Sequence, residues 1–299
     1  MEPSSSRRWE DNMGQYIKLA RPHHWIKNAL VLLPLICSGQ LLQWEKLQKG
    51  LWAFLAFSLL ASAIYCINDV RDREKDRQSP AKRNRPVASG AIGVQGALSF
   101  CGVLLVLAAG CGWMAAGASP VAWLWLGLYF FLNLGYSLGL KNLPIVDIAI
   151  LVSGFLLRML YGGAVTEIEL SKWLCLTVIS MSFYLGLGKR RGERTGSGDQ
   201  GRKVLRYYTK TFLDQNMYMC VALTVMFYAL WTVDALTVAR VGSEALIWTV
   251  PLVILICMKY SLDVEGQSDG DPVEVLLRDR LLLCMGTLLA AVIFLLIYL

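Results

Sequence analysis

Charge is scarce in this chain. Only 17% of its 299 residues are charged and 56% are hydrophobic, which is too apolar for an ordinary soluble domain. The composition instead predicts a membrane protein that crosses the bilayer several times. The formal net charge of +7 is explained by basic cytoplasmic loops that face anionic lipid. We therefore expect no nucleic-acid partner.

Residues for metal centres and covalent catalysis are also few. The eight cysteines form no C-x-x-C pair and lie in or beside apolar segments, which excludes a zinc site and a disulfide framework. The only two histidines, His23 and His24, are interpreted as membrane-interface residues. No Ser-His-Asp arrangement or cysteine nucleophile is visible. The first 20 residues show no cleavable signal peptide, so the first membrane helix is expected to direct insertion.

Long apolar segments are abundant. They lie near 25–42, 51–67, 94–115, 120–140, 144–165, 173–188, 217–238, 244–260 and 281–299. The sequence thus predicts an all-α protein with nine transmembrane helices, several near the minimum length for a bilayer of about 30 Å. We expect a polar N-terminal segment, 1–20, and one membrane domain, 21–299, with cytoplasmic loops near 68–93 and 189–216.

The basic residues indicate an orientation. With the N-terminus inside, 24 of the 29 lysines and arginines fall on the cytoplasmic side, four on the opposite side and one within a helix. The positive-inside rule then predicts a cytoplasmic N-terminus and a C-terminus outside.

One acidic motif stands out where the second apolar segment ends. Asn68 to Asp76 reads N-D-x-x-D-x-x-x-D. On one continuous helix, Asp69, Asp72 and Asp76 fall within about 60° of one another, whereas Glu74 points away from them. Carboxylate oxygens suit Mg²⁺, which in turn binds phosphate oxygens. The motif predicts a Mg²⁺ site at the membrane surface, although solvated surface charge is the alternative.

Other polar residues fall at the same cytoplasmic boundary. Such a layer of acidic and basic groups suits a phosphorylated substrate bound with Mg²⁺. Each basic residue here has an alternative role as a topology signal. The residues are Lys82, Arg83 and Arg85 in the first loop, Tyr136, Lys141 and Asp147 in the middle, and Lys189, Arg190 and Arg191 in the second loop.

Arg158 lies inside an otherwise apolar segment. A charge at such depth is costly and generally faces a cavity or a partner, so Arg158 is a candidate substrate-binding residue. Structural pairing inside the helix bundle is the alternative. Asp147 shares its helix face, about 16 Å away along the axis, and the two are expected to line one cavity without pairing directly.

These residues resemble a known family. The acidic motif, together with Tyr136, Lys141 and Asp147, is similar to the UbiA superfamily of membrane prenyltransferases. Three further segments resemble its branch of decaprenyl-phosphate phosphoribosyltransferases. They are the Arg-Pro-x-x-Trp-Ile-Lys-Asn segment at 21–28, the Asn-Arg-Pro-x-Ala-Ser-Gly segment at 84–90 and the Leu-Gly-Lys-Arg-Arg segment at 187–191. The resemblance covers about residues 15–299.

The resemblance implies a UbiA-type helix bundle in a bacterial inner membrane, with a cytoplasmic active site. It implies transfer of 5-phosphoribose from phosphoribosyl pyrophosphate (PRPP) to a polyprenyl phosphate for cell-envelope polysaccharide synthesis. Asp69, Asp72 and Asp76 would hold Mg²⁺ with help from Asn68, and Tyr136, Lys141 and Asp147 would complete the pocket. The remaining residues expected to bind substrate are Lys27, Asn28, Lys82, Arg83, Arg85, Arg158, Lys189, Arg190 and Arg191.

The branch usually has a basic residue where this chain has His23. If that residue binds the lipid phosphate, the contact here is expected to be weaker or pH-dependent. Two other functions stay open: alkylation of an aromatic acceptor by a polyprenyl diphosphate, and carriage of a lipid-linked substrate without catalysis. Small residues on the helix faces also allow a homo-oligomer.

Overall fold

The computed structural model describes residues 5–80, 82–197, 203–266 and 272–299, and all its regular elements are helices. In chain order they are α1 (Ser5–Ala20), η1 (Pro22–Leu32), α2 (Leu33–Cys37), α3 (Trp44–Arg71), α4 (Arg73–Gln78), α5 (Val94–Ala116), α6 (Pro120–Leu138), η2 (Leu140–Asn142), α7 (Val146–Thr166), α8 (Lys172–Ser197), η4 (Lys203–Tyr207), α9 (Lys210–Thr232), α10 (Ala235–Val241), η5 (Ala245–Thr249), α11 (Val250–Glu265), α12 (Pro272–Arg278) and α13 (Arg280–Tyr298). The all-α prediction is confirmed for these residues.

Local sequence explains several helix boundaries. Pro120 at the first turn of α6 suits a position that needs no N–H donor. Thr209 and Asp279 cap α9 and α13 by accepting the backbone N–H groups of Phe212 and Leu282. At the end of α5, Gly117 has a φ of 53°, which glycine adopts at little cost.

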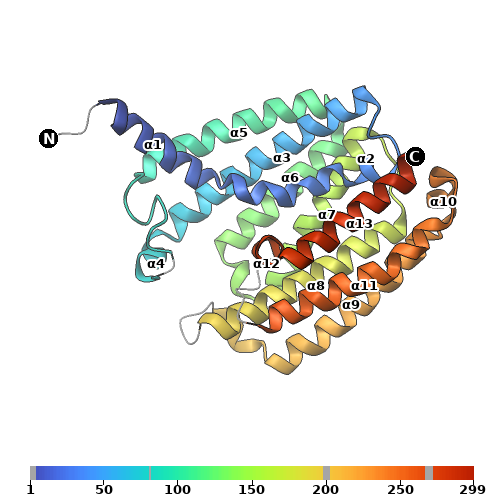
Figure 1. The fold of residues 1–299 in the computed structure, drawn as a ribbon. Coiled ribbons are helices and arrows are strands. Elements are labelled where there is room, and N and C mark those ends of the chain that lie inside the picture. Colours follow the sequence, from blue (N-terminus) through green and yellow to red (C-terminus); the bar gives the residue numbers. More distant parts are fainter. Residues whose placement is uncertain (1–4, 81, 198–202, 267–271) are drawn as a thin grey trace.

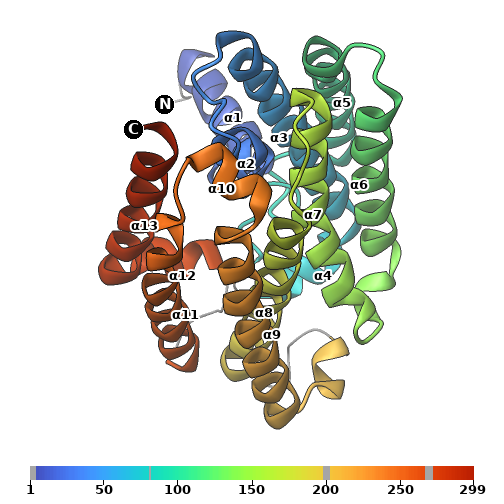
Figure 2. The same ribbon diagram turned by 90° about the vertical axis from the view of Figure 1, so that its right-hand side faces the viewer.

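The long helices run side by side through the bundle (Figures 1 and 2). Six described helices are long and apolar enough to cross a membrane, or seven spans if the bent pair α9 and α10 forms one. The protein is therefore a multi-pass membrane protein, and the count of nine spans stays a prediction. The N-terminal helix α1 and the end of α13 lie at opposite ends of the bundle (Figure 1).

Three predicted segments differ in detail from the structure. Most of the expected first span, 25–42, is 3-10 helix followed by the short α2. The polar segment 1–20 is helical from Ser5 onward. The predicted loop 189–216 is largely helical, because α8 extends to Ser197 and α9 begins at Lys210. Residues 1–4 and 198–202 of these segments lie outside the described residues.

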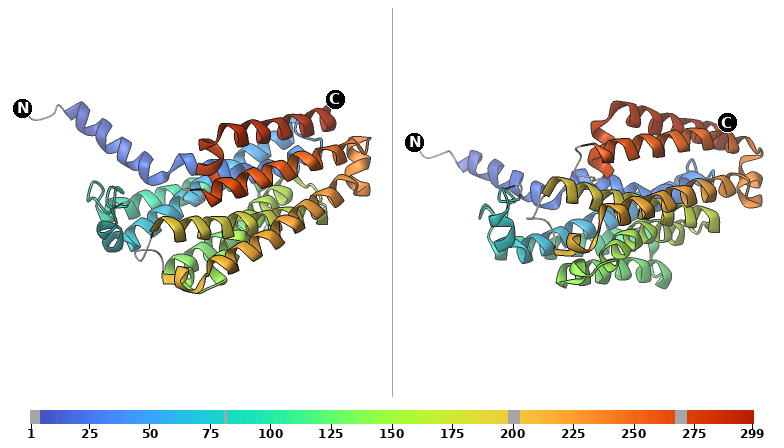
Figure 3. Two further views of the ribbon diagram at one scale, coloured as in Figure 1. Left: turned by 60° about the horizontal axis from the view of Figure 1, so that its bottom comes forward. Right: turned by 90° about the horizontal axis from the view of Figure 1, so that it is seen from below.

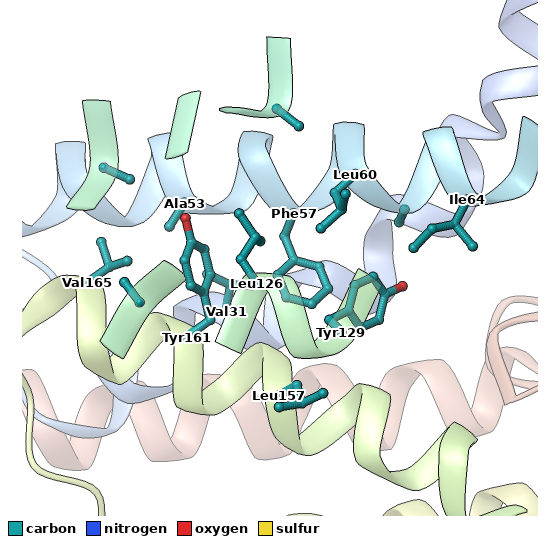
Figure 4. Packing of buried hydrophobic residues seen from close by; sticks show 14 residues of the cluster. Val31, Ala53, Phe57, Leu60, Ile64, Leu126, Tyr129, Leu157, Tyr161 and Val165 are labelled. Atoms are coloured by element: carbon teal, nitrogen blue, oxygen red, sulfur yellow. The ribbon is translucent and has the colours of Figure 1, made fainter. Parts of the chain in front are cut away.

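Helix α7 stands between two hydrophobic cores. One core joins η1, α3, α5 and α6 to the α7 residues Leu157, Tyr161 and Val165 (Figure 4). The other joins α8, α9 and α11–α13 to Ile148 and Val152 of α7. Gly162 of α7 permits close packing on η1, since a Cβ there would lie 1.9 Å from the carbonyl oxygen of Val31. Buried on both sides, α7 provides a rigid mount for the polar residues at its ends.

The ribbon views show which elements lie at each end and edge of the bundle (Figures 1 and 3). Helices α11 and α13 run together along one edge of the bundle (Figure 3). Helix α4 and the segment around η4 lie at the same end as α1, whereas α10 lies at the opposite end (Figure 1). The acidic motif and the start of α9 are thereby brought to one end of the molecule.

Candidate functional site

The acidic motif spans a break between two helices. Helix α3 ends at Arg71, α4 begins at Arg73, and Asp72 between them has φ −87° and ψ 5°. The expectation of one uninterrupted helix is therefore wrong at Asp72. Helical hydrogen bonds continue across the break, from the N–H of Asp72 to the Asn68 carbonyl (2.9 Å) and from the N–H of Asp76 to the Asp72 carbonyl (2.8 Å). The aspartates thus stay close together although α3 and α4 are separate helices.

Two arginines from other parts of the chain neutralise Asp69 and Asp76. Arg85 lies 2.7 Å from Oδ2 of Asp76 and 3.4 Å from Oδ1 of Asp69, so one guanidinium bridges both carboxylates. Arg21 donates to the same Oδ1 of Asp69 at 2.6 Å and lies over the ring of Tyr65. Both aspartates are almost fully buried. Charge-assisted bonds of this kind offset part of the cost of that burial.

The end of α6 completes this group. Lys141 lies 2.8 and 2.6 Å from the two carboxylate oxygens of Asp72. The Ser137 hydroxyl donates to Oδ1 of Asn68. We call Arg21, Asp69, Asp72, Asp76, Arg85 and Lys141 the acidic-motif cluster. It unites residues from the start of η1, from α3–α4, from the loop after α4 and from the turn after α6.

A second ionic group, the Asp147 cluster, lies at the start of α7. The carboxylate of Asp147 accepts from Nε of Arg190 at 2.7 Å and from the hydroxyl of Tyr208. Arg190 also pairs with Glu193 at 2.7 Å and donates to the Tyr136 hydroxyl at 3.3 Å. The side chains of Asp147 and Arg190 are both 0% exposed. Tyr136 is the chain neighbour of Ser137, whose hydroxyl bonds Asn68 of the acidic motif.

Tyr208 has two further effects. Its hydroxyl accepts the backbone N–H of Ile145 at 2.6 Å, and Ile145 has a φ of 68°, which is strained for a β-branched residue. Burial, aided by the hydrogen bond to Asp147, raises the pKa of Tyr208 above its ordinary value. The phenol therefore stays a hydrogen-bond donor at neutral pH and holds the start of α7 in place.

Arg158 is held inside the bundle. Its guanidinium donates to Asn28 Oδ1 at 2.8 Å, to the Gly154 carbonyl at 2.6 Å and to the Tyr129 hydroxyl at 3.1 Å. It also lies over the rings of Phe57 and Tyr129. Asp147 and Arg158 thus have separate sets of partners. Asn28 and Arg158 form a structural pair between η1 and α7, and substrate contact by either stays a prediction.

The other basic residues that were predicted to bind substrate lie in three different parts of the structure. Lys82 and Arg83 lie on the same loop as Arg85, and Lys189 is the half-buried neighbour of Arg190. Arg191 pairs instead with Asp214 at 2.6 Å and with Glu265 at 3.4 Å, so it joins α8 to α9 and α11. The structure therefore brings Arg85 and Lys141 to the acidic motif but places Arg191 in a different ion-pair group.

An apolar groove of about 320 Å³ lies beside η1. Its walls come from η1, α7, α8 and α11–α13, and Lys27 is the basic residue among those that line it. Arg21 at the start of η1 contacts Asp69, while Ile26 and Leu30 of the same element line the groove. One short segment therefore joins the ionic cluster to the groove.

Sequence reasoning did not assign a role to Arg21 or Tyr208. Arg21 has a left-handed backbone, with φ 54° and ψ 58°, immediately before Pro22. Its place in the Arg-Pro-x-x-Trp segment was the available signal, but the pairing with Asp69 spans 48 residues. Tyr208 lies 61 residues from Asp147, and nothing in the sequence indicates that contact.

The carboxylates of the acidic motif have one feature of a cation site. Oδ2 of Asp69 is buried and accepts no hydrogen bond, which is the kind of oxygen that a cation would satisfy. Among the described residues, however, no group of three or more His, Cys, Asp or Glu side chains is placed to hold a metal ion. Arg85 stands between Asp69 and Asp76 instead. The donor chemistry fits a hard divalent cation, provided that Arg85 moves aside.

Comparison with known proteins agrees with this architecture. The sequence model of the UbiA prenyltransferase family matches residues 31–277. The chain is 37% identical to decaprenyl-phosphate phosphoribosyltransferase of Corynebacterium glutamicum, over 89% of this chain and 81% of that protein. Its identity to the enzyme of the same name from Mycobacterium tuberculosis is also 37%, over 89% of this chain and 88% of that one.

The fold is shared with a solved structure. A UbiA homologue from Archaeoglobus fulgidus, determined with GPP and Mg²⁺ bound, superimposes with a TM-score of 0.70 at 19% identity, covering 95% of this chain and 99% of that chain. This likeness shows the fold alone, whereas the family match covers most of the sequence. The chain therefore belongs to the UbiA prenyltransferase family.

Proposed function

We propose that this protein transfers 5-phosphoribose from PRPP to a polyprenyl phosphate, releasing pyrophosphate. The observation that carries the proposal is the link through η1 between a charged cluster and an apolar groove. A water-soluble, highly anionic donor and a lipid acceptor need these two environments side by side. The similarity to decaprenyl-phosphate phosphoribosyltransferases over about nine-tenths of the chain supports the same reaction.

The donor site would be the acidic-motif cluster. Arg85, Lys141 and Arg21 bring three basic groups within hydrogen-bond distance of the motif, where they can also bind the phosphate groups of PRPP. A divalent cation, when held by Asp69 and Asp76 with Asp72 and Asn68 nearby, would neutralise charge on the pyrophosphate. Lys82 and Arg83, on the same loop as Arg85, extend the basic surface.

The acceptor would lie along the groove. Its apolar wall suits an isoprenoid chain, and Lys27, the basic residue that lines it, suits the phosphate at the end of that chain. Asn28, the next residue, is fixed by Ser58 and Arg158 and so holds this turn of η1 in place. The lipid phosphate would then point along η1 toward Arg21 and Asp69.

The chemistry needs no strong base or covalent nucleophile. An oxygen of the lipid phosphate is already anionic at neutral pH, and it forms a bond to C1 of the ribose. The bond from C1 to the pyrophosphate oxygen breaks, and pyrophosphate leaves with that electron pair. The protein contributes by positioning the two anions and by stabilising the departing charge with its basic side chains.

The direct test is label transfer by the purified protein in detergent. Radiolabelled ribosyl PRPP, polyprenyl phosphate and Mg²⁺ should give label in the organic phase, and EDTA should abolish it. Asp72→Asn should lower turnover at least about 100-fold, because the half-exposed Asp72 carboxylate would no longer place Lys141 and the cation. Its thermal unfolding midpoint should change little.

The alternative is tested in a parallel reaction. If no label enters the lipid but a polyprenyl diphosphate is consumed with an aromatic acceptor, the protein is a prenyltransferase of the more common UbiA type. Cation-dependent turnover that survives in Asp72→Asn would contradict the placement of the active site at the acidic motif.

A further inference from the structure

The acidic-motif cluster is already neutralised from within the chain. Its three carboxylates, Asp69, Asp72 and Asp76, face three bases, Arg21, Arg85 and Lys141. A site built to hold a divalent cation is thus stabilised without one. Any incoming cation has to compete with at least one of these bases for carboxylate oxygens.

Arg85 occupies the position where a cation would compete most directly. Its NH1 atom alone contacts both Asp69 and Asp76, the two most buried carboxylates of the motif. Lys141 instead contacts Asp72 only. A cation held by both Asp69 and Asp76 therefore cannot bind while the Arg85 guanidinium bridges these two carboxylates.

Arg85 is also better able to move than Arg21. It lies in the irregular segment between α4 and α5, and its side chain is 29% exposed. Arg21 is 18% exposed, stacks on Tyr65 and has a left-handed backbone that fixes its direction. A rotamer change at Arg21 would break its contact with the Tyr65 ring as well as its ion pair with Asp69.

We propose that Arg85 is an exchangeable counter-ion of the acidic motif. It bridges Asp69 and Asp76 while the site is empty, yields them to the divalent cation that arrives with the donor, and turns its guanidinium to the donor's phosphate groups. The inference rests on the proposed function for the identity of the donor. It makes cation binding weak in the absence of donor and couples the two ligands.

The test measures metal and donor binding separately from activity. Mn²⁺ serves as the probe, because the EPR signal of free Mn²⁺ reports how much is bound to the detergent-solubilised protein. Arg85→Gln should bind Mn²⁺ alone about tenfold more tightly than the unmodified protein, since the competing charge is gone. With saturating Mg²⁺, the same variant should bind PRPP about tenfold more weakly. If Arg85 had only a structural role, Arg85→Gln would weaken the binding of both Mn²⁺ and PRPP.

Matched variants separate this effect from general electrostatics. Arg73→Gln removes the same charge from a partly exposed position beside Asp72, where Arg73 pairs with Glu74. It should leave Mn²⁺ affinity within about twofold. Arg85→Lys keeps the charge but loses the planar fork of the guanidinium. Its Mn²⁺ affinity should therefore fall between those of Arg85→Gln and Arg73→Gln. It also serves as the folded alternative if Arg85→Gln does not fold. Asp69→Asn in the Arg85→Gln background should remove the tight binding.

Several outcomes would overturn the proposal. They are unchanged or weaker Mn²⁺ binding in folded Arg85→Gln, equal tightening in Arg73→Gln, or tight binding that persists without the Asp69 carboxylate. If PRPP is turned over but Mn²⁺ binding does not tighten, the counter-ion inference fails and the proposed function stands. If Mn²⁺ binding tightens but PRPP is neither bound nor used, the proposed function fails instead.

Discussion

The acidic-motif cluster and the Asp147 cluster use the same kinds of groups in opposite ways. In the first, the bases are 17–29% exposed and each comes from a different segment. In the second, Asp147 and Arg190 are 0% exposed and are saturated by Tyr208, Glu193 and Tyr136. Partly exposed pairs can exchange partners with a ligand at small cost, whereas a sealed pair cannot. The difference supports the proposal that the first cluster binds ligand and that the second holds the site in place.

This difference refines the role predicted for Asp147 and Arg190. Both were expected to contact the substrate directly, yet their side chains face each other away from solvent. In this arrangement they hold Tyr136, on α6, beside the acidic-motif cluster. A role in positioning the site is therefore the simplest interpretation, and direct contact stays a prediction.

Asp147→Asn should give the largest effect on stability. The substitution keeps an acceptor for Tyr208 but leaves the buried Arg190 with Glu193 as its remaining carboxylate. Breaking a buried ion pair costs about 3–5 kcal/mol, and the retained Glu193 places the expected loss near the lower end. Thermal unfolding in detergent should show it. A stable variant with turnover as low as that of Asp72→Asn would instead make Asp147 a residue that contacts the substrate.

Arg158→Lys should have a moderate effect of the same kind. A lysine has no fork to reach Asn28, the Gly154 carbonyl and Tyr129 together, so one buried acceptor loses its donor, at a cost of about 1–3 kcal/mol. Turnover per folded molecule should stay within about threefold of the unmodified protein. A loss of turnover with unchanged stability would restore the predicted role of Arg158 in substrate binding.

Much of this architecture is predictable from sequence, for identifiable reasons. Apolar segments place the helices because a bilayer requires long apolar spans, and the spacing of Asp69, Asp72 and Asp76 identifies the charged end. The partners of these residues are not predictable in the same way. The contact of Arg21 with Asp69 depends on how η1 packs on α3, and that of Tyr208 with Asp147 on how the segment after α8 returns to α7. Local periodicity carries neither piece of information.

Tyr208→Phe should give a smaller loss of stability, because Asp147 and the N–H of Ile145 each lose a partner, and this loss should decrease at alkaline pH. The pKa of Tyr208 is raised by burial and by its bond to Asp147, while an unfolded tyrosine ionises near pH 10. The native phenol therefore stays protonated above that pH, so its contribution to the free energy of unfolding is constant below about pH 10 and falls as the pH rises further.

The measurement is the unfolding midpoint of both proteins from pH 8 to 11. The difference between them isolates Tyr208, because the other buried tyrosines are common to both. The unmodified protein should lose stability faster above pH 10, by a fraction of the roughly 1.4 kcal/mol per pH unit that one group can contribute. Parallel curves would show that Tyr208 ionises as freely in the native protein as in the unfolded chain.

Glu74→Gln should have the smallest effect, although Glu74 lies within the acidic motif itself. Its carboxylate is exposed, and a hydrogen bond from Arg73, with the charge of Arg77, holds the pKa of Glu74 below its ordinary value. Glu74 is therefore ionised at neutral pH yet contacts neither Arg85 nor Lys141 in this arrangement. Turnover of PRPP and Mn²⁺ affinity should both match the unmodified protein within error. A loss of turnover comparable to that in Asp72→Asn would show that the total charge of the motif matters more than which carboxylates face the bases. The distinction between the acidic-motif cluster and the Asp147 cluster would then lose its basis.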